Sequence, residues 1–234
     1  MSEKSFPEEK LVWKETEERV KTAAIKAGRD PNEIRIMAVT KTVEPERINE
    51  VIRAGCDLLG ENRVQEFLEK EKSYDPTAEV HFIGRLQTNK VKYIVDKVTM
   101  IESVDSVRLA EEIEKRCASI GKTMDVLLEV NIANEENKGG FQYEEIWNVL
   151  EIIDGFSHLR VRGLMTIGRF GADFEETKQY FKKMHQLFVD IKSKKLDNRY
   201  IDILSMGMSS DYELAVAEGA TIIRIGRGLF GERK

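Results

Sequence analysis

The chain has 234 residues, of which 41% are hydrophobic and 34% are charged, a composition typical of a globular protein rather than a disordered one. Its formal net charge of −5 argues against a nucleic-acid-binding protein, which usually carries a basic excess or a basic stripe. The two cysteines, Cys56 and Cys117, are too few for a disulfide framework and lack metal-ligand spacing, so we expect no metal site and a reducing compartment.

The amino-terminal segment has no apolar run of the kind found in a signal peptide. No apolar stretch of the chain approaches the roughly 18 residues that a membrane-spanning helix needs. We therefore expect a cytoplasmic protein with no membrane partner.

Taken in chain order, the sequence begins with a predicted helix over residues 8–27 and then alternates short β-branched runs with longer helical patterns. The predicted strands cover residues 34–40, 57–60, 80–84, 99–101, 125–131, 159–165, 201–204 and 221–225. The predicted helices between them cover residues 45–54, 64–72, 89–95, 106–120, 143–153, 174–193 and 209–218. Gly28 and Gly55 follow helical runs at positions where a left-handed cap is expected. Ala110, Ile113, Cys117 and Ile120 recur at helical spacing and are expected to face the sheet.

This repeated order of strands and helices, with no linker between them, predicts one α/β domain with a parallel sheet over residues 1–234. A closed TIM-type (β/α)8 barrel is the natural arrangement, and an open doubly wound sheet is the alternative. The open sheet usually carries a glycine-rich turn after its first strand. The turn here, Thr40-Lys41-Thr42, has no glycine, which favours the barrel.

In such a barrel, functional residues gather at the carboxyl ends of the strands. Lys41 ends the first strand on the same face as Met37 and Val39. Partial desolvation there would lower the pKa of a lysine from about 10.4 and supply the neutral amine that Schiff-base formation needs. A lysine that extends past the strand end into solvent is the plainer alternative.

The predicted fifth strand carries polar residues on one face, among them Asp125, Glu129 and Asn131. Buried charges need partners, and Arg160 and Arg162 on the next strand are suitable ones. For Asp125 and Glu129 we favour a structural ion network over a catalytic role. His81, taken alone, is typical of a core histidine with its hydrogen bonds satisfied.

Two loops near the carboxyl terminus resemble phosphate-binding turns. The segment from Ser205 to Asp211 joins a strand to a helix and contains glycine and serines, while Gly226-Arg227-Gly228 follows the last strand. Backbone N–H groups of such turns approach oxyanions closely, and barrels often bind phosphate after strands seven and eight. A ligand with a phosphate and an aldehyde would satisfy both these loops and Lys41. Pyridoxal 5′-phosphate (PLP) is one such ligand, and a phosphorylated sugar handled by a Schiff-base aldolase is another.

Several segments, in order and along nearly the whole chain, resemble the YggS/PROSC family, the PLP homeostasis proteins. They are residues 39–43, 60–66, 81–90, 163–167, 205–209 and 224–226. The resemblance implies the fold-type III PLP barrel, similar to the N-terminal domain of alanine racemase. It also implies a protein that holds PLP as an internal aldimine and buffers or delivers it, with PLP-dependent apo-enzymes as partners.

The resemblance further implies roles for individual residues. Lys41 matches the aldimine lysine, and Arg224 matches the arginine that faces the pyridine nitrogen. The expected cofactor-binding set is Lys41, Asn62, His81, Met165, Ser205, Met206, Ser209, Arg224, Gly226 and Arg227. Many relatives have threonine or serine where this chain has Arg227, which places a hydroxyl contact to phosphate in doubt at that position.

The arginine at position 224 has a chemical consequence, because guanidinium is a permanent donor and favours an unprotonated pyridine, which weakens the electron sink. Alanine racemase compensates with a catalytic tyrosine from a second domain. The sequence shows no such domain, so we expect a non-catalytic, monomeric PLP carrier. A racemase-like enzyme acting on amino acids is the alternative.

Overall fold

The computed structural model describes residues 7–169, 171–194 and 200–231. Within them, eight parallel strands follow one another around a closed barrel in chain order. The strands are β1 (Arg35–Val39), β2 (Leu58–Glu61), β3 (Glu79–Phe82), β4 (Met100–Val104), β5 (Met124–Glu129), β6 (Leu159–Met165), β7 (Ile203–Ser205) and β8 (Ile222–Ile225). Because β1 pairs in parallel with both β2 and β8, the sheet has no edge, which confirms the barrel over the open sheet.

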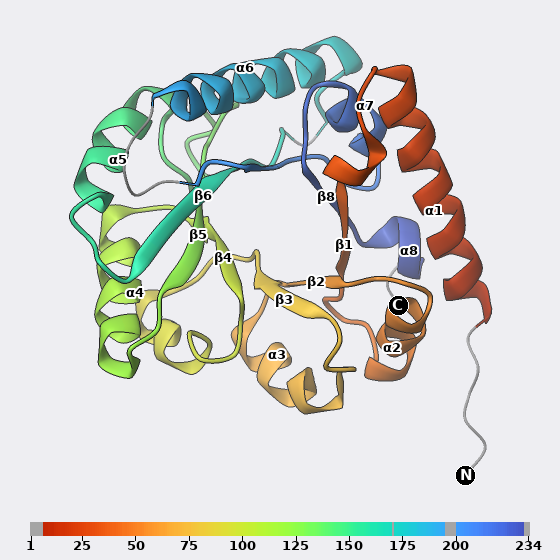
Figure 1. Cartoon of the computed structure of the whole chain (residues 1–234), viewed down its shortest axis with the longest axis horizontal. Coiled ribbons are helices and arrows are strands. Elements are labelled where there is room, and N and C mark those ends of the chain that lie inside the picture. The colour runs from red at the N-terminus through yellow and green to blue at the C-terminus, as the bar shows by residue number, and fades with distance from the viewer. Residues whose placement is uncertain (1–6, 170, 195–199, 232–234) are drawn as a thin grey trace.

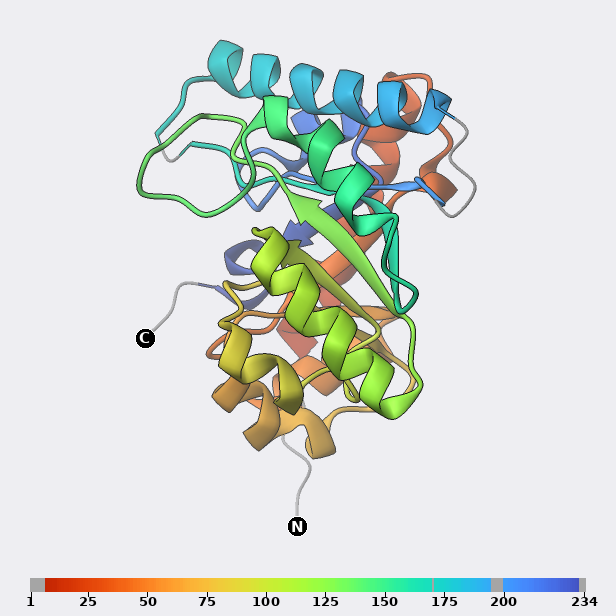
Figure 2. The same cartoon turned by 90° about the vertical axis from the view of Figure 1, so that its left-hand side faces the viewer.

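Helices surround the barrel on its outside (Figure 1). They are α1 (Pro7–Lys26), α2 (Pro45–Arg53), α3 (Val64–Lys70), α4 (Val107–Ile120), α5 (Ile146–Ile153), α6 (Phe174–Ser193), α7 (Tyr212–Ala217) and α8 (Arg227–Phe230). Short 3₁₀ turns cover η1 (Pro31–Glu33), η2 (Glu71–Ser73), η3 (Thr88–Tyr93) and η4 (Tyr143–Glu145). Figure 2 shows α4, α5 and α6 one above another on one side of the molecule.

Most predicted elements are confirmed to within a few residues, and the differences have local causes. The helix predicted at 89–95 is the 3₁₀ turn η3, and the short helix α8 was not predicted. Ala110, Ile113 and Cys117 are buried as expected, whereas Ile120 is 50% exposed. It is the last residue of α4, where Gly121 turns the chain away with a left-handed φ of 65°.

The core has two parts because strand side chains alternate between the two faces of the sheet. Ile36 and Ala38 pack outward against the helices, whereas Met37 and Val39 point into the barrel. Lys41 continues this inward-facing series past the end of β1. Among the described residues, no helix combines the length and the apolar character that crossing a bilayer requires.

Candidate functional site

A cavity of about 740 Å³ opens at the carboxyl ends of the strands and contains Lys41. Its lining comes from opposite ends of the sequence, because barrel closure puts β8 beside β1. Six of the predicted site residues line it: Lys41, Asn62, Ser209, Arg224, Gly226 and Arg227. The amine and both predicted phosphate loops therefore face one space.

The turn that carries Lys41 is held in an uncommon backbone conformation. Thr42 has φ 62°, a left-handed value that a β-branched residue rarely adopts and that neighbouring contacts must maintain. The backbone N–H of Thr42 donates to Glu66. The ammonium of Lys70 donates to the Thr40 carbonyl at 3.0 Å and to Glu66 at 2.7 Å. Together Glu66 and Lys70 of α3 fix the direction in which the Lys41 side chain leaves the backbone.

A buried carboxyl supports the same turn from the outer side of the sheet. Glu61 is fully buried and accepts hydrogen bonds from the Thr40 hydroxyl, at 2.6 Å, and from the Tyr74 hydroxyl. Burial raises the pKa of Glu61 above its ordinary value, although the two hydroxyls and Lys70 act in the opposite direction. The carboxyl thus ties the end of β1 to β2 and to the segment after α3.

Asn62 lies at the end of β2 with a polar atom available for a ligand. Its side-chain Oδ1 is buried and has no hydrogen-bond partner among the described residues. Gly84, just after β3, allows its segment of the chain to pass close behind Asn62, since a Cβ at position 84 would lie 2.1 Å from the Asn62 carbonyl oxygen. A buried amide atom without a partner is unfavourable unless a bound group satisfies it.

The two predicted phosphate loops meet at the opposite wall. The N–H of Gly228, in the first turn of α8, donates to the Ser209 hydroxyl at 3.1 Å. Gly207 has φ 91°, and a Cβ there would lie 2.4 Å from the Ala215 Cβ, so this turn requires glycine to pack on α7. Gly226 lies beside Val39, close to the end of β1. Arg227 is exposed and forms no ion pair with another described residue, so it adds positive charge to this wall.

Arg224 enters the cavity from β8 and is almost completely buried. Its Nη1 donates to the Ser205 hydroxyl and its Nη2 donates to the Thr166 carbonyl, each at 2.7 Å. The Ser205 hydroxyl in turn donates to Glu102 at 2.6 Å. Burial lowers the pKa of Arg224 from its ordinary value, and the charge of Glu102 opposes that shift. These fixed contacts set the orientation of the guanidinium plane.

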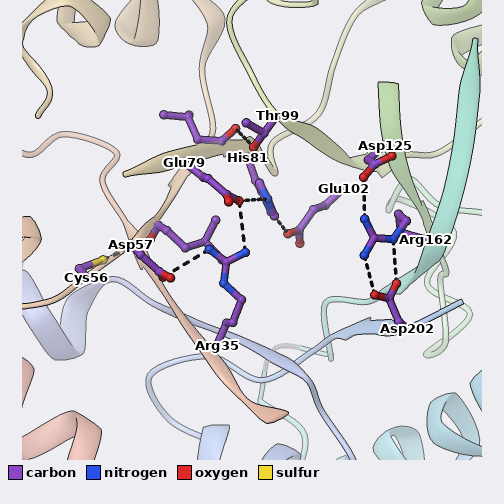
Figure 3. A network of polar contacts seen from close by, with 12 residues as sticks. Arg35, Cys56, Asp57, Glu79, His81, Thr99, Glu102, Asp125, Arg162 and Asp202 are labelled. Carbon is purple, nitrogen blue, oxygen red and sulfur yellow. Dashed lines mark hydrogen bonds and ion pairs between the residues drawn. The ribbon is translucent and has the colours of Figure 1, made fainter. Parts of the chain in front are cut away.

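His81 lies at the other side of Glu102, with its Nδ1 2.7 Å from the second carboxylate oxygen (Figure 3). Burial disfavours the charged form of both groups, yet their hydrogen bond raises the pKa of His81 and lowers that of Glu102. The Nε2 of His81 lies 3.8 Å from Glu79, which also pairs with Arg35. Linked polar side chains therefore run through the barrel beneath the cavity, and we call them the column: Arg35, Glu79, His81, Glu102, Ser205 and Arg224.

Four predicted site residues are buried and are not among the residues lining the cavity. His81 and Ser205 belong to the column below it. Met165 packs inside the barrel with Met100 and Leu127. The side chain of Met206 packs in the outer core between strands and helices, because it follows the inward-facing Ser205 and strand side chains alternate. These residues can act on a ligand through their neighbours or, for Met206, through its backbone.

The polar face of β5 divides into two environments. Asp125 forms the predicted ion network with Arg160, whose Nε lies at 2.5 Å. It also pairs with Arg162, whose Nη1 lies at 2.7 Å (Figure 3). Arg162 also pairs with Asp202. Glu129 forms no ion pair among the described residues. Burial, followed by the charge of Asp105, raises its pKa to about 7.

Sequence reasoning missed the residues that support the site from behind. Glu102 and Thr166 hold Ser205 and Arg224, and Lys138 and Arg169 add cations to the cavity lining. Glu66 lies in a segment that carried the family resemblance, so the sequence did contain a signal for it. Glu102 is fully buried in β4, and a carboxylate within a buried strand is itself a signal of an interior network. In the described part of the chain, no cluster of His, Cys, Asp or Glu could hold a metal ion.

The model of the family described as alanine racemase, N-terminal domain, matches residues 17–234. The structure of alanine racemase from Corynebacterium glutamicum has a TM-score of 0.71 and 14% identity, covering 93% of this chain and 61% of that one. At this identity the likeness shows the fold alone. The class of protein that fold and site define is therefore a barrel of the alanine racemase N-terminal type with a lysine at the end of its first strand.

More similar relatives cover nearly the whole chain. A pyridoxal phosphate homeostasis protein of Aquifex aeolicus is 46% identical over 218 residues, which are 93% of this chain and 95% of the relative. The protein of that name from Escherichia coli K12 is 34% identical over 220 residues, covering 92% and 93%. PipY of Synechococcus elongatus, in its structure with PLP bound, has a TM-score of 0.79 and 32% identity, covering 91% and 100%. The chain belongs to the family of pyridoxal phosphate homeostasis proteins.

Proposed function

We propose that this protein binds PLP covalently through Lys41 and serves as a carrier that buffers and delivers the cofactor. The observation that carries the proposal is the shared cavity, in which Lys41 faces the two loops that end β7 and β8. The family membership and the PLP-bound structure of PipY support the same ligand.

The residues present fit PLP by their chemistry. The unpartnered Oδ1 end of Asn62 offers its carboxamide to a polar ring substituent. The Ser209–Gly228 junction and Gly226 supply hydroxyl and backbone groups for a phosphate, and Arg227 adds charge from the rim. Met206 contributes through its backbone, and Met165 packs inside the barrel with Met100 and Leu127. Ser205 and His81 are positioning residues: Ser205 accepts a hydrogen bond directly from Arg224, and His81 holds Ser205 through Glu102.

Bound PLP would supply an aldehyde that condenses with the Lys41 amine, forming a C=N bond and releasing water. The chain's own contribution is orientation. The Glu66–Lys70 pair directs Lys41 into the cavity. Arg224, with two of its nitrogens engaged, presents a group that donates hydrogen bonds but cannot accept one from a protonated ring nitrogen. Such a donor disfavours the protonated ring on which strong carbanion stabilisation depends, which supports a carrier rather than an enzyme. We propose further that the carrier works as a cytoplasmic monomer with PLP-dependent apo-enzymes as recipients.

The test of the lysine is the visible absorption band of the purified protein. Wild type should show the band of a lysine-bound PLP, and borohydride reduction should fix the cofactor on the peptide that contains Lys41. Lys41→Ala should lose both signals. Lys138→Ala is the matched control, because Lys138 lines the same cavity, and it should retain them. A full band and a reducible adduct in Lys41→Ala would show that the lysine assignment is wrong.

The carrier role is tested with the cofactor-loaded protein. Incubation with the apo-form of a PLP-dependent aminotransferase should restore that enzyme's activity. The rate of this reactivation should exceed the rate at which the carrier releases PLP into solution, which is measured separately with free lysine as a trap. Incubation with L-alanine should give at most stoichiometric change. Sustained turnover of L-alanine to D-alanine would refute the carrier role and support the racemase-like alternative.

A further inference from the structure

A second and larger cavity, of about 1040 Å³, lies beside the first on the side of β2, β3 and β4. We call it the arginine groove, because Arg63, Arg85 and Arg108 line it from the loops after β2 and β3 and from α4. Asn62 lines both cavities, so the groove is continuous with the proposed cofactor site. A molecule bound in the groove would lie next to the mouth of the barrel.

The three guanidinium groups carry charge that the chain itself does not use. All three are exposed, and within the part of the chain that the structure describes none of their guanidinium groups donates a hydrogen bond or forms an ion pair. Lys90 adds a fourth cation to the lining. Three carboxylates also line the groove: Glu66, which is engaged by Lys70 and the Thr42 N–H, Asp105, which accepts a hydrogen bond from the Ser106 hydroxyl at 3.1 Å, and Glu69. The lining thus has four cations against three carboxylates, an excess of positive charge in a chain whose formal net charge is −5.

The segments that supply the groove are those by which the sequence resembles its family. Within residues 60–66 and 81–90 only Asn62 and His81 were expected to serve the cofactor. Most of the other polar side chains of these segments line the groove: Arg63, Gln65, Glu66, Arg85, Gln87, Thr88 and Lys90. Exposed, unpaired arginines contribute little to fold stability. Their gathering beside the cofactor site indicates a binding role.

We infer that the arginine groove docks an acidic segment of the protein that receives PLP from this carrier, an inference that rests on the proposed function. Guanidinium groups bind carboxylates in paired hydrogen bonds and steer an acidic partner during encounter. The volume of the groove lies at the upper end of the roughly 300–1,000 Å³ of small-molecule sites, which fits an extended acidic segment better than one small anion. Docking there would place the acceptor's empty site beside Lys41.

The probe is a fluorescein-labelled peptide of consecutive glutamates, and its binding to the cofactor-loaded protein is measured by fluorescence anisotropy at low salt. The charge-reversed variant is Arg63→Glu/Arg85→Glu/Arg108→Glu. Its control is Lys10→Glu/Lys115→Glu/Lys182→Glu, which makes the same change of charge at exposed positions of α1, α4 and α6. We expect the charge-reversed variant to lose at least about tenfold in affinity, whereas the control binds as wild type does. Arg85→Glu alone should give a smaller loss, and it serves if the triple variant does not fold.

Equal binding by the two triple variants would overturn the inference. So would full competition by single glutamate or inorganic phosphate at the peptide's own concentration, which would indicate a small-anion site. Tighter binding of a single-stranded oligonucleotide than of the peptide would overturn it as well. The visible band, read in the same samples, separates the two proposals. A protein without the band contradicts PLP binding on Lys41, whereas a protein with the band that ignores the peptide contradicts the groove alone.

Discussion

Replacing Glu129 by glutamine should change how the stability of the protein depends on pH. Glu129 ends β5, and burial together with the charge of Asp105 raises its pKa from 4.5 to about 7. The folded chain therefore holds a proton on this carboxyl between those values, while the unfolded chain has released it. The contribution of Glu129 to stability is fully present below pH 4.5, is lost as pH rises through about 7, and is level above that.

The size of the effect follows from the shift. Each pKa unit corresponds to about 1.4 kcal/mol, so the rise of Glu129 from 4.5 to about 7 amounts to about 3 kcal/mol over the whole window. Glu129→Gln keeps the shape of the side chain and cannot ionise. The variant should be more stable than wild type by up to about 3 kcal/mol at alkaline pH, and the difference should nearly vanish at the acidic end.

Urea unfolding at matched cofactor loading, at several pH values across this window, measures the difference directly. Glu151→Gln removes a carboxylate that is exposed on α5, and it should leave the pH profile of wild type unchanged. A Glu129→Gln variant whose stability differs from wild type by the same amount at every pH would refute the reasoning. So would a wild-type protein that gains stability as pH rises through this window.

Two further substitutions test how the site is supported. Gly84→Ala should destabilise the protein by about 1–3 kcal/mol in urea unfolding, because the new Cβ would lie 2.1 Å from the Asn62 carbonyl oxygen. Gly168→Ala is the control and should be neutral, since a Cβ there would have no heavy atom within 4 Å. Equal effects of the two substitutions would contradict the argument. Lys70→Met removes the ammonium that holds the turn after β1, which carries Lys41, and should weaken PLP binding about tenfold in spectroscopic titration. Lys72→Met, at an exposed position, is the control and should bind PLP as wild type does. Unaltered binding by Lys70→Met would show that the turn keeps its conformation without the hydrogen bonds of Lys70.

Strand alternation explains which parts of the site the sequence could predict. Met37 and Val39 alternate with outward residues, so the inward direction of Lys41 follows from counting along β1. The same count places Ser205 inward and Met206 outward, which agrees with the packing of the Met206 side chain in the outer core. Glycines also marked both phosphate loops, because a turn that requires glycine can be recognised from a few neighbouring residues of sequence.

The support of Arg224 could not be predicted in this way, because its partners lie far away along the chain. The hydrogen bond between Ser205 and Glu102 joins residues 103 positions apart, and the one between Arg224 and Thr166 spans 58. The alternation of side chains along each strand does not predict which inward-facing polar side chains of different strands lie at the same height in the barrel. That height depends on the stagger of the closed sheet, and the register irregularities between β4, β5 and β6 alter it locally.

The charged column in the barrel is better explained by orientation than by stability. Burying ionised groups costs several kcal/mol for each, which paired charges offset only in part, so an apolar filling would serve the fold at least as well. In this chain the column runs from Arg35 through Glu79 and His81 to Glu102, and from there through the Ser205 hydroxyl to Arg224 at the cavity end. Each link fixes the next, and the last fixes a guanidinium that cannot lose its proton at physiological pH. A rigid, permanent donor beneath the cofactor suits a protein that must hold PLP without activating it.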